Sequence, residues 1–160
     1  MQEMHIYGVS FDLVGKQPIV LLKTAEGNKF LPIWIGHPEA AAILMKLQSA
    51  STPRPMTHDL VTDMLEQLDA QVIRITVTEL KESTFYASIT VQQNGSEVEI
   101  DSRPSDAIAL AVRADAPIFV ADEVIDDSAI EFNQEPEDSG EVIDEFKKCL
   151  ENVSPEDFGN

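Results

Sequence analysis

The 160-residue sequence has a single cysteine, Cys149, and no long apolar run. One cysteine cannot form an internal disulfide or build a zinc site alone, so neither is expected to hold this fold together. No apolar stretch approaches the roughly 20 residues that span a bilayer. The N-terminus also lacks the basic start, apolar block and small-residue cleavage site of a signal peptide. We therefore expect a soluble, cytoplasmic protein with no membrane association.

Basic residues are scarce as well. The chain has 11 Lys and Arg residues against 29 Asp and Glu residues, which gives a formal net charge of -18. Such a charge repels a polyanion at long range, and any nucleic-acid role must overcome this repulsion. The bases near the N-terminal aromatic residues are scattered, a weak signal for single-strand binding; they are Lys16, Lys23, Lys29, Lys46 and Arg54.

The first half of the chain predicts three strands followed by two helices. Apolar runs over residues 4–13, 18–24 and 29–35, separated by turn-forming residues, are typical of an antiparallel meander. A helix is expected over residues 36–50, with Pro38 in its first turn. A second helix is expected over residues 57–70 with Thr57 as its cap. We expect its apolar face to belong to the core; that face consists of Leu60, Val61, Met64, Leu65 and Leu68.

The second half changes to a period of two. Apolar and polar residues alternate over residues 73–77 and 85–91, as in strands with one buried face, and Asn94-Gly95 suits a tight turn to a further strand over 97–101. A helix from Ser105 to Ala114, capped by Ser105, and a short strand over 117–121 follow. The pattern predicts an α+β fold, with a mixed, mostly antiparallel sheet, helices packed on it and an acidic C-terminal tail.

We divide the chain into a domain over residues 1–130 and a tail over residues 131–160. The tail begins with a polar, turn-forming linker and continues with a possible acidic helix over residues 141–153. Val142, Phe146 and Leu150 lie along one face of that helix. Docking of this face and partial disorder of the tail are both open.

The sequence contains no Gly-rich phosphate loop, nucleophile elbow or paired metal-binding motif. Polar residues gather instead at three expected helix starts. They are His37 and Glu39, then His58 and Asp59, then Arg103, Ser105 and Asp106, with Asp101 and Arg113 as possible additions. Such a carboxylate and imidazole cluster could hold a divalent ion that bridges to phosphate and activates water. Alternatively, the acids complement helix dipoles and Arg103 pairs with a nearby carboxylate.

Three blocks in this order resemble the bifunctional nuclease family, also called the BFN domain. They are "LPIWIGHPEAAAILMKLQ", "RPMTHDLVTDMLEQLDA" and "SRPSDAIALAVRADAPIFVADEV", and the resemblance covers roughly Met4 to Ile130. It implies an α+β domain, often a homo-oligomer, with activity on RNA and DNA. The recurring polar positions of the family fall on Glu39, His58, Asp59, Arg103, Ser105 and Asp106.

Cluster and resemblance together predict a nuclease assisted by a divalent metal, Mg or Mn. The metal or base candidates are Glu39, Asp59 and Asp106, His58 is the proton carrier, and the substrate contacts are Arg103, Ser105 and Arg113. The alternative is a non-catalytic oligomeric module that binds or regulates a protein or small ligand through the same residues. The charge of -18 and the absence of a strong catalytic motif support that alternative.

Overall fold

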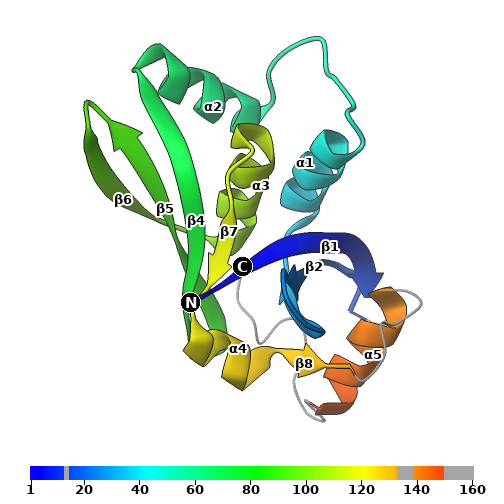
Figure 1. Cartoon of the computed structure of the whole chain (residues 1–160). Helices are drawn as coiled ribbons and strands as arrows, with labels where there is room; N and C mark the ends of the chain where they lie inside the picture. The colour runs from blue at the N-terminus through cyan, green and yellow to red at the C-terminus, as the bar shows by residue number, and fades with distance from the viewer. Residues whose placement is uncertain (13–14, 133–138, 150–160) are drawn as a thin grey trace.

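The structure, a computed structural model, describes residues 1–12, 15–132 and 139–149 (Figure 1). Within these ranges the chain forms eight strands and five helices. The strands are β1 (Gln2–Asp12), β2 (Gln17–Thr24), β3 (Lys29–Trp34), β4 (Ala70–Lys81), β5 (Thr84–Gln93), β6 (Ser96–Ser102), β7 (Ile118–Val120) and β8 (Ile130–Glu131). The helices are α1 (His37–Leu47), α2 (Thr57–Gln67), α3 (Pro104–Ala114), α4 (Asp122–Ser128) and α5 (Ser139–Cys149). The predicted α+β class is confirmed.

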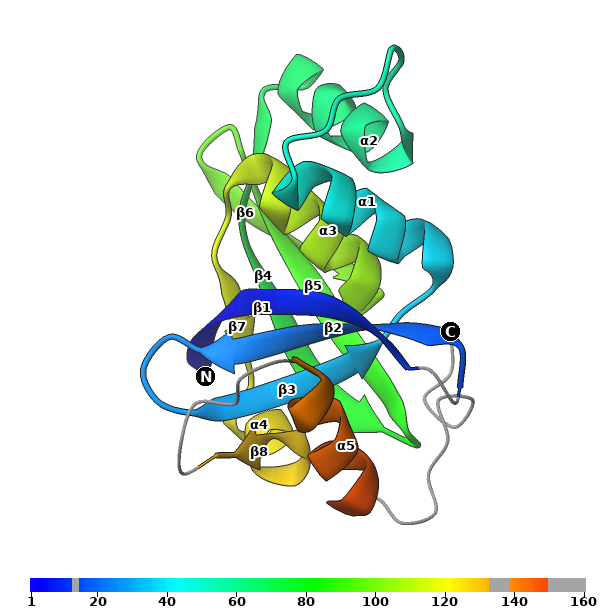
Figure 2. The same cartoon turned by 90° about the vertical axis from the view of Figure 1, so that its right-hand side faces the viewer.

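The strands form one sheet in the order β6-β5-β4-β7-β1-β2-β3-β8. It is built from two antiparallel meanders, β1-β2-β3 and β4-β5-β6. Strand β7 joins them, because it pairs antiparallel with β1 and parallel with β4. Among the described strands, β4 and β7 are the one parallel pair. Helices α1, α2 and α3 gather at one end of the molecule, and α4 and α5 lie at the other (Figures 1 and 2).

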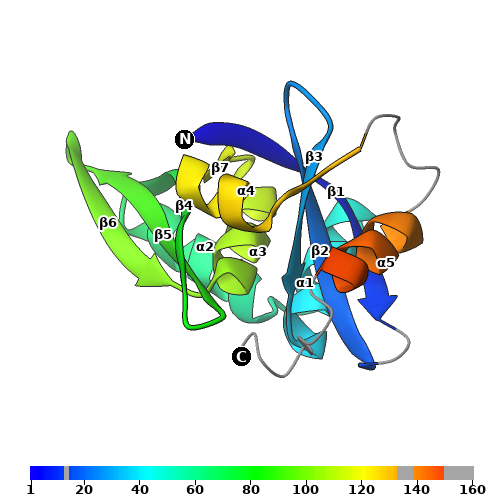
Figure 3. The same cartoon turned by 90° about the horizontal axis from the view of Figure 1, so that it is seen from below.

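Helix α3 is the central helix. It packs on β4 and β5 and touches both α1 and α2, and Figure 3 shows it from below between the two halves of the sheet. Its sequence alternates small and large apolar residues, so most of its surface can be buried at close range. The buried residues are Pro104, Ser105, Ala107, Ile108, Ala109, Leu110 and Ala111.

Both predicted helix caps are wrong. Helix α3 begins at Pro104 with Arg103 at its N-cap, which leaves Ser105 one position inside the helix, where it is buried. Helix α2 begins at Thr57 with Met56 at its N-cap. A side chain of the same helix satisfies the amide at the N-cap: the backbone N–H of Met56 donates to Asp59 Oδ2 over 2.9 Å. The proline at the start of α3 explains the error, since it suits a first helical position better than a strand end.

The expected core face of α2 is largely exposed, a second correction. Leu60, Met64 and Leu68 are 51%, 55% and 61% exposed, and Leu65 is only partly buried. The opposite side of α2 faces the molecule, because His58 and Asp59 make ion-pair contacts there with residues of α3. Rotating α2 to bury its apolar side would break those contacts.

The C-terminal part of the chain differs from the prediction in its elements. Helix α4 and strand β8 had no counterpart in the prediction. Helix α5 overlaps the predicted tail helix and packs near β1, β3 and β8, with Val142 buried. The expected contributions of Phe146 and Leu150 and the linker over residues 133–138 lie outside what the structure describes. Among the described residues, none of the helices combines the length and apolar character that crossing a bilayer requires.

Two buried threonines give a matched test of the core. Thr90 is fully buried in β5, and its hydroxyl has no hydrogen-bond partner within the described part of the chain. We expect Thr90→Val to raise the free energy of unfolding by about 1 kcal/mol, because it removes an unsatisfied polar group. Thr24 is equally buried, but its hydroxyl contacts the backbone N–H and carbonyl of Lys29. Thr24→Val should lower stability by about 1 kcal/mol.

Chemical denaturation of both variants measures this difference. Equal changes in the two variants would contradict the assignment of Thr90 as an unsatisfied group.

Candidate functional site

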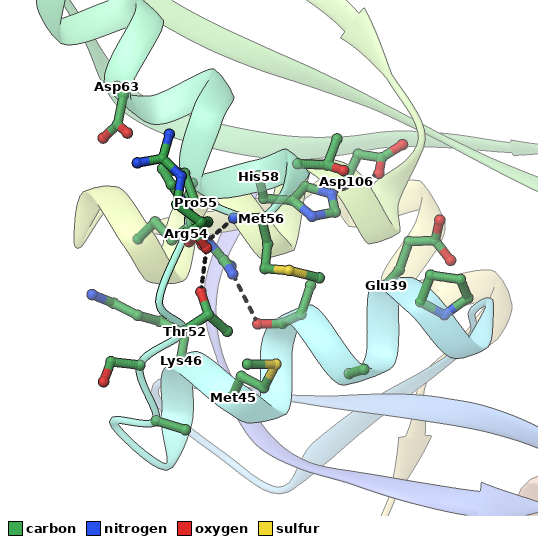
Figure 4. Close-up of a pocket in the computed structure, with 18 of the residues that line it drawn as sticks. Glu39, Met45, Lys46, Thr52, Arg54, Pro55, Met56, His58, Asp63 and Asp106 are labelled. Atoms are coloured by element: carbon green, nitrogen blue, oxygen red, sulfur yellow. Dashed lines mark hydrogen bonds and ion pairs between the residues drawn. The ribbon is translucent and has the colours of Figure 1, made fainter.

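A cavity of about 590 Å³ lies where α1, the α1–α2 connection, α2 and the N-terminal part of α3 meet (Figure 4). Six of the seven predicted site residues line it, and they come from three separate segments of the chain. These six are Glu39, His58, Asp59, Arg103, Asp106 and Arg113. Ser105 is buried and does not line the cavity, and neither do His37 and Asp101. The structure thus brings the three polar helix starts together.

Four of these side chains form a linked network, which we call the Arg103 network. His58 Nε2 lies 2.9 Å from Asp106 Oδ1. Arg103 Nε donates to Asp106 Oδ2 over 2.8 Å, and Arg103 Nη2 donates to Glu39 Oε1 over 3.0 Å. Arg103 therefore ties the start of α1 to the start of α3, and Asp106 accepts from both a guanidinium and an imidazole.

Gly36 makes room for one member of this network. It is the N-cap of α1, and Glu39 lies three positions later. A Cβ atom at position 36 would overlap Glu39 Oε2. A larger residue here would make the Glu39 carboxylate shift from its place beside Arg103, whereas the backbone at position 36 is extended and suits any residue.

A second pair braces the base of the cavity. Arg113 Nε donates to Asp59 Oδ1 over 2.6 Å, and its two terminal nitrogens donate to the carbonyls of Ala109 and Ala42. The Arg113 side chain is only 7% exposed. Because the three nitrogens of its guanidinium donate to residues of α1, α2 and α3, Arg113 links the three helices.

The ionisation of the site follows from these contacts. Burial raises the pKa of Asp106, but the hydrogen bonds from His58 and Arg103 outweigh it and hold the pKa below its ordinary value. The backbone N–H of Met56 and the Arg113 side chain lower the pKa of Asp59. The hydrogen bond to Asp106 raises the pKa of Arg103. At neutral pH both aspartates are thus anionic and Arg103 is cationic.

The imidazole is therefore the group at this site suited to proton transfer. An ionised Asp106 accepts from a ring N–H, which places the proton of a neutral His58 on Nε2 and leaves Nδ1 as the acceptor. The His58 carbonyl is held by the hydroxyl of Thr62 over 3.0 Å. The ring is 12% exposed, enough to meet a ligand and little enough to stay oriented.

The charge of the cavity differs sharply from that of the chain. Four of the eleven Lys and Arg residues line it, and four acids line it too. The bases are Lys46, Arg54, Arg103 and Arg113, and the acids are Glu39, Asp59, Asp63 and Asp106. With His58 neutral the cavity carries no net formal charge, in a protein of net charge -18. The cavity is therefore an electrically neutral region of a strongly acidic protein.

A resident metal ion does not fit the carboxylates as they are arranged. Within the described residues no three His, Cys, Asp or Glu side chains are grouped closely enough to hold an ion. Glu39 and Asp106 are bound to Arg103, and Asp59 is bound to Arg113. A divalent metal remains a prediction, and no step below depends on it.

Sequence reasoning passed over two bases at this site. Lys46 and Arg54 were dismissed as scattered, yet both line the cavity. Lys46 is in the last turn of α1, and Arg54 lies between two prolines in the connection to α2. The signal that could have found them is their position: Lys46 lies inside, and Arg54 shortly before, a predicted helix that carries a candidate site residue.

Fold and site together define an α+β protein with a histidine–aspartate–arginine cavity framed by three helices. The family model described as "Bifunctional nuclease domain" matches residues 20–133, which include every residue that lines the cavity. The chain belongs to the bifunctional nuclease domain family.

Relatives of two kinds accompany this match. An uncharacterized protein of Mycobacterium tuberculosis is 35% identical over 164 residues, covering 99% of this chain and 98% of the relative. Bifunctional nuclease 1 of Oryza sativa subsp. indica is 28% identical, over 86% of this chain and 43% of the relative. Bifunctional nuclease 1 of Arabidopsis thaliana is 30% identical, over 64% of this chain and 33% of the relative. The chain thus spans less than half the length of these plant relatives.

Replacement of Asp59 tests the second pair. Asp59→Asn removes the anionic partner of Arg113, and we expect it to lower the free energy of unfolding by about 1 kcal/mol or more at pH 7. Because the pKa of Asp59 is depressed in the folded protein, its contribution is present above the ordinary aspartate pKa of about 3.9 and is lost as the pH falls through the folded value. The difference between wild type and variant should therefore shrink below about pH 4.

Denaturation at a series of pH values measures this difference. Asp63→Asn, an exposed acid of the same helix with no ion pair in the described part of the chain, is the control and should change stability by less than about 0.5 kcal/mol. A pH-independent loss in Asp59→Asn would contradict the electrostatic role.

Proposed function

We propose that this protein hydrolyses phosphodiester bonds in RNA and DNA, with the Arg103 network as its active site. The observation that carries the proposal is an imidazole held at 2.9 Å by an anionic aspartate, next to a half-exposed arginine, in one cavity. Carboxylate-oriented imidazoles are suited to general acid–base catalysis. Membership of the bifunctional nuclease domain family and the names of the plant relatives support the same reaction.

In this proposal Arg103 binds the scissile phosphate. Its side chain is 51% exposed, and its Nε and Nη2 are used by Asp106 and Glu39, so Nη1 is the nitrogen that can meet a ligand. An arginine fixed by two carboxylates presents its charge without losing much conformational freedom on binding. It stabilises the negative charge that builds on the phosphoryl oxygens.

His58 then serves as the general base. Its Nδ1 accepts a proton from the attacking water, the new P–O bond forms, and the bond to the leaving oxygen breaks, with a proton from solvent completing the alcohol. Asp106 orients the ring and stabilises the imidazolium that forms. Since water attacks, the reaction does not need a 2′-hydroxyl and can act on both kinds of nucleic acid.

The alternative is a non-catalytic module that binds a protein or small ligand at the same cavity. One observation favours it: the three candidate acids Glu39, Asp59 and Asp106 are each committed to an arginine. Assembly into a homo-oligomer and a cytoplasmic location also remain predictions, which sedimentation and fractionation would test.

Cleavage assays decide between these functions. We expect labelled single-stranded RNA and DNA to be cut by the full-length protein, and His58→Gln, Asp106→Asn and Arg103→Ala each to lower kcat by about 100-fold or more. Parallel reactions with magnesium, manganese and a chelator determine whether a divalent ion takes part.

Thermal melts of the same variants are the control for folding. His37→Gln, which changes a histidine at the start of α1 that does not line the cavity, should keep wild-type cleavage. Undiminished cleavage in folded Asp106→Asn would refute the active-site assignment. No cleavage by wild type under any condition would favour the binding module.

A further inference from the structure

We propose that Lys46 and Arg54 form a second phosphate-binding subsite, which holds a nucleic-acid strand by a phosphate beyond the one that is cleaved. The proposal deepens the proposed function and rests on it for the identity of the ligand. Figure 4 shows Lys46 and Arg54 at one end of the cavity and Glu39 and Asp106 at the other. One ligand that reaches both ends must therefore carry more than one anionic group.

The four cations that line the cavity fall into two groups, according to whether they form ion pairs with carboxylates. Arg103 donates from Nε and Nη2 to carboxylates and keeps Nη1 for the scissile phosphate, and Arg113 donates to Asp59 and to two backbone carbonyls. Lys46 and Arg54 are exposed, and within the described part of the chain neither makes an ion pair. Their charges are thus available to an incoming anion at no cost in existing contacts.

The backbone holds Arg54 in place. Pro53 and Pro55 flank it, and a residue before proline is restricted to extended conformations. The hydroxyl of Thr52 donates to the Arg54 carbonyl over 2.6 Å, a contact drawn in Figure 4. The backbone of Lys46 is also fixed, because Lys46 lies in the last turn of α1. Less ordering is needed on binding when the backbone is already fixed.

The remaining wall of the cavity has few side chains of the kinds that stack on bases. Its apolar lining includes Met45, Pro53, Pro55 and Met56. Among the described residues that line it there is no Phe, Tyr, Trp, Asn or Gln. Phe, Tyr and Trp are the usual rings on which bases stack, and Asn and Gln pair with adenine edges. We therefore expect phosphate contacts to carry most of the affinity at this end of the cavity.

Because the net charge of -18 repels a polyanion, a nucleic-acid strand needs attractive contacts of the kind that this subsite provides. With 11 Lys and Arg against 29 Asp and Glu, the protein as a whole repels a strand, so we expect affinity to come from a few contacts inside the neutral cavity. Removing two of its four cations should therefore weaken binding far more than removing two cations elsewhere.

The test compares two doubly substituted full-length proteins. Lys46→Gln with Arg54→Gln removes the subsite. Lys16→Gln with Lys81→Gln removes the same charge from the β1–β2 connection and from the end of β4, and neither lysine lines the cavity. Binding is measured by fluorescence anisotropy of a labelled single-stranded oligonucleotide with phosphorothioate linkages, in chelator and over a series of salt concentrations.

We expect the subsite variant to bind about 10-fold or more weakly. The slope of log affinity against log salt should fall by about 0.7, since one phosphate contact to a single strand is lost. The control variant should keep the wild-type slope. Lys46→Arg with Arg54→Lys, which conserves the charge, should restore most of the affinity. Equal affinity in the subsite and control variants overturns the proposal, and so does a wild type that binds no oligonucleotide.

A kinetic measurement separates this subsite from the active site. Bis(p-nitrophenyl) phosphate carries one phosphodiester and cannot reach both ends of the cavity. In the subsite variant the ratio of kcat/KM for the oligonucleotide to kcat/KM for this small ester should fall about 10-fold, through a raised KM. An unchanged ratio overturns the proposal. A wild type that binds the oligonucleotide but cleaves neither substrate refutes the proposed function and leaves the binding result to decide the subsite.

Discussion

The burial of α3 between the sheet and helices α1 and α2 is the constraint on which the site depends. Its alanines at 107, 109 and 111 allow its neighbours to approach closely, and Arg103, Asp106 and Arg113 are carried on its first and last turns. A contact such as Asp106 to His58 exists only because the helices are held at this spacing. The chemistry of the site is thus set by packing, and a larger side chain on the buried face of α3 would separate donors from acceptors while leaving every charged residue in the sequence.

Electrostatic balance inside the cavity explains how an acidic protein can face an anionic ligand. Arg103 pairs with Asp106, the carboxylate that orients the imidazole, so the negative charge that orients His58 is balanced locally. Lys46 and Arg54, which make no ion pair in the described part of the chain, lie at the other end of the cavity. The same arrangement disfavours a resident cation, because the oxygen ligands that a metal would need are already occupied.

Much of the fold could be predicted from the sequence, since the period of two in the strands and the polar starts of the helices are local signals. The sheet class and the position of α3 follow from them. The orientation of α2 could not, because an apolar stripe shows which side of a helix is apolar and not whether a partner covers it. Its inward side is instead selected by His58 and Asp59, whose partners lie some 50 residues away in α3. The residues of the site were recognisable one by one, but their roles, and the addition of Lys46 and Arg54, required the tertiary arrangement.

Strand β7 has a consequence for how the protein acquires this site. Within each meander, hairpin turns join the strands. Each meander can therefore form from local contacts, which close quickly. They become one sheet only when residues 118–120 insert between residues 2–4 and residues 75–77. Glu39 follows the first meander, whereas Arg103 and Asp106 follow the second. We therefore expect the cavity to assemble late in folding, at the step that also completes the sheet, so a newly made chain has native-like strands before it has a competent site.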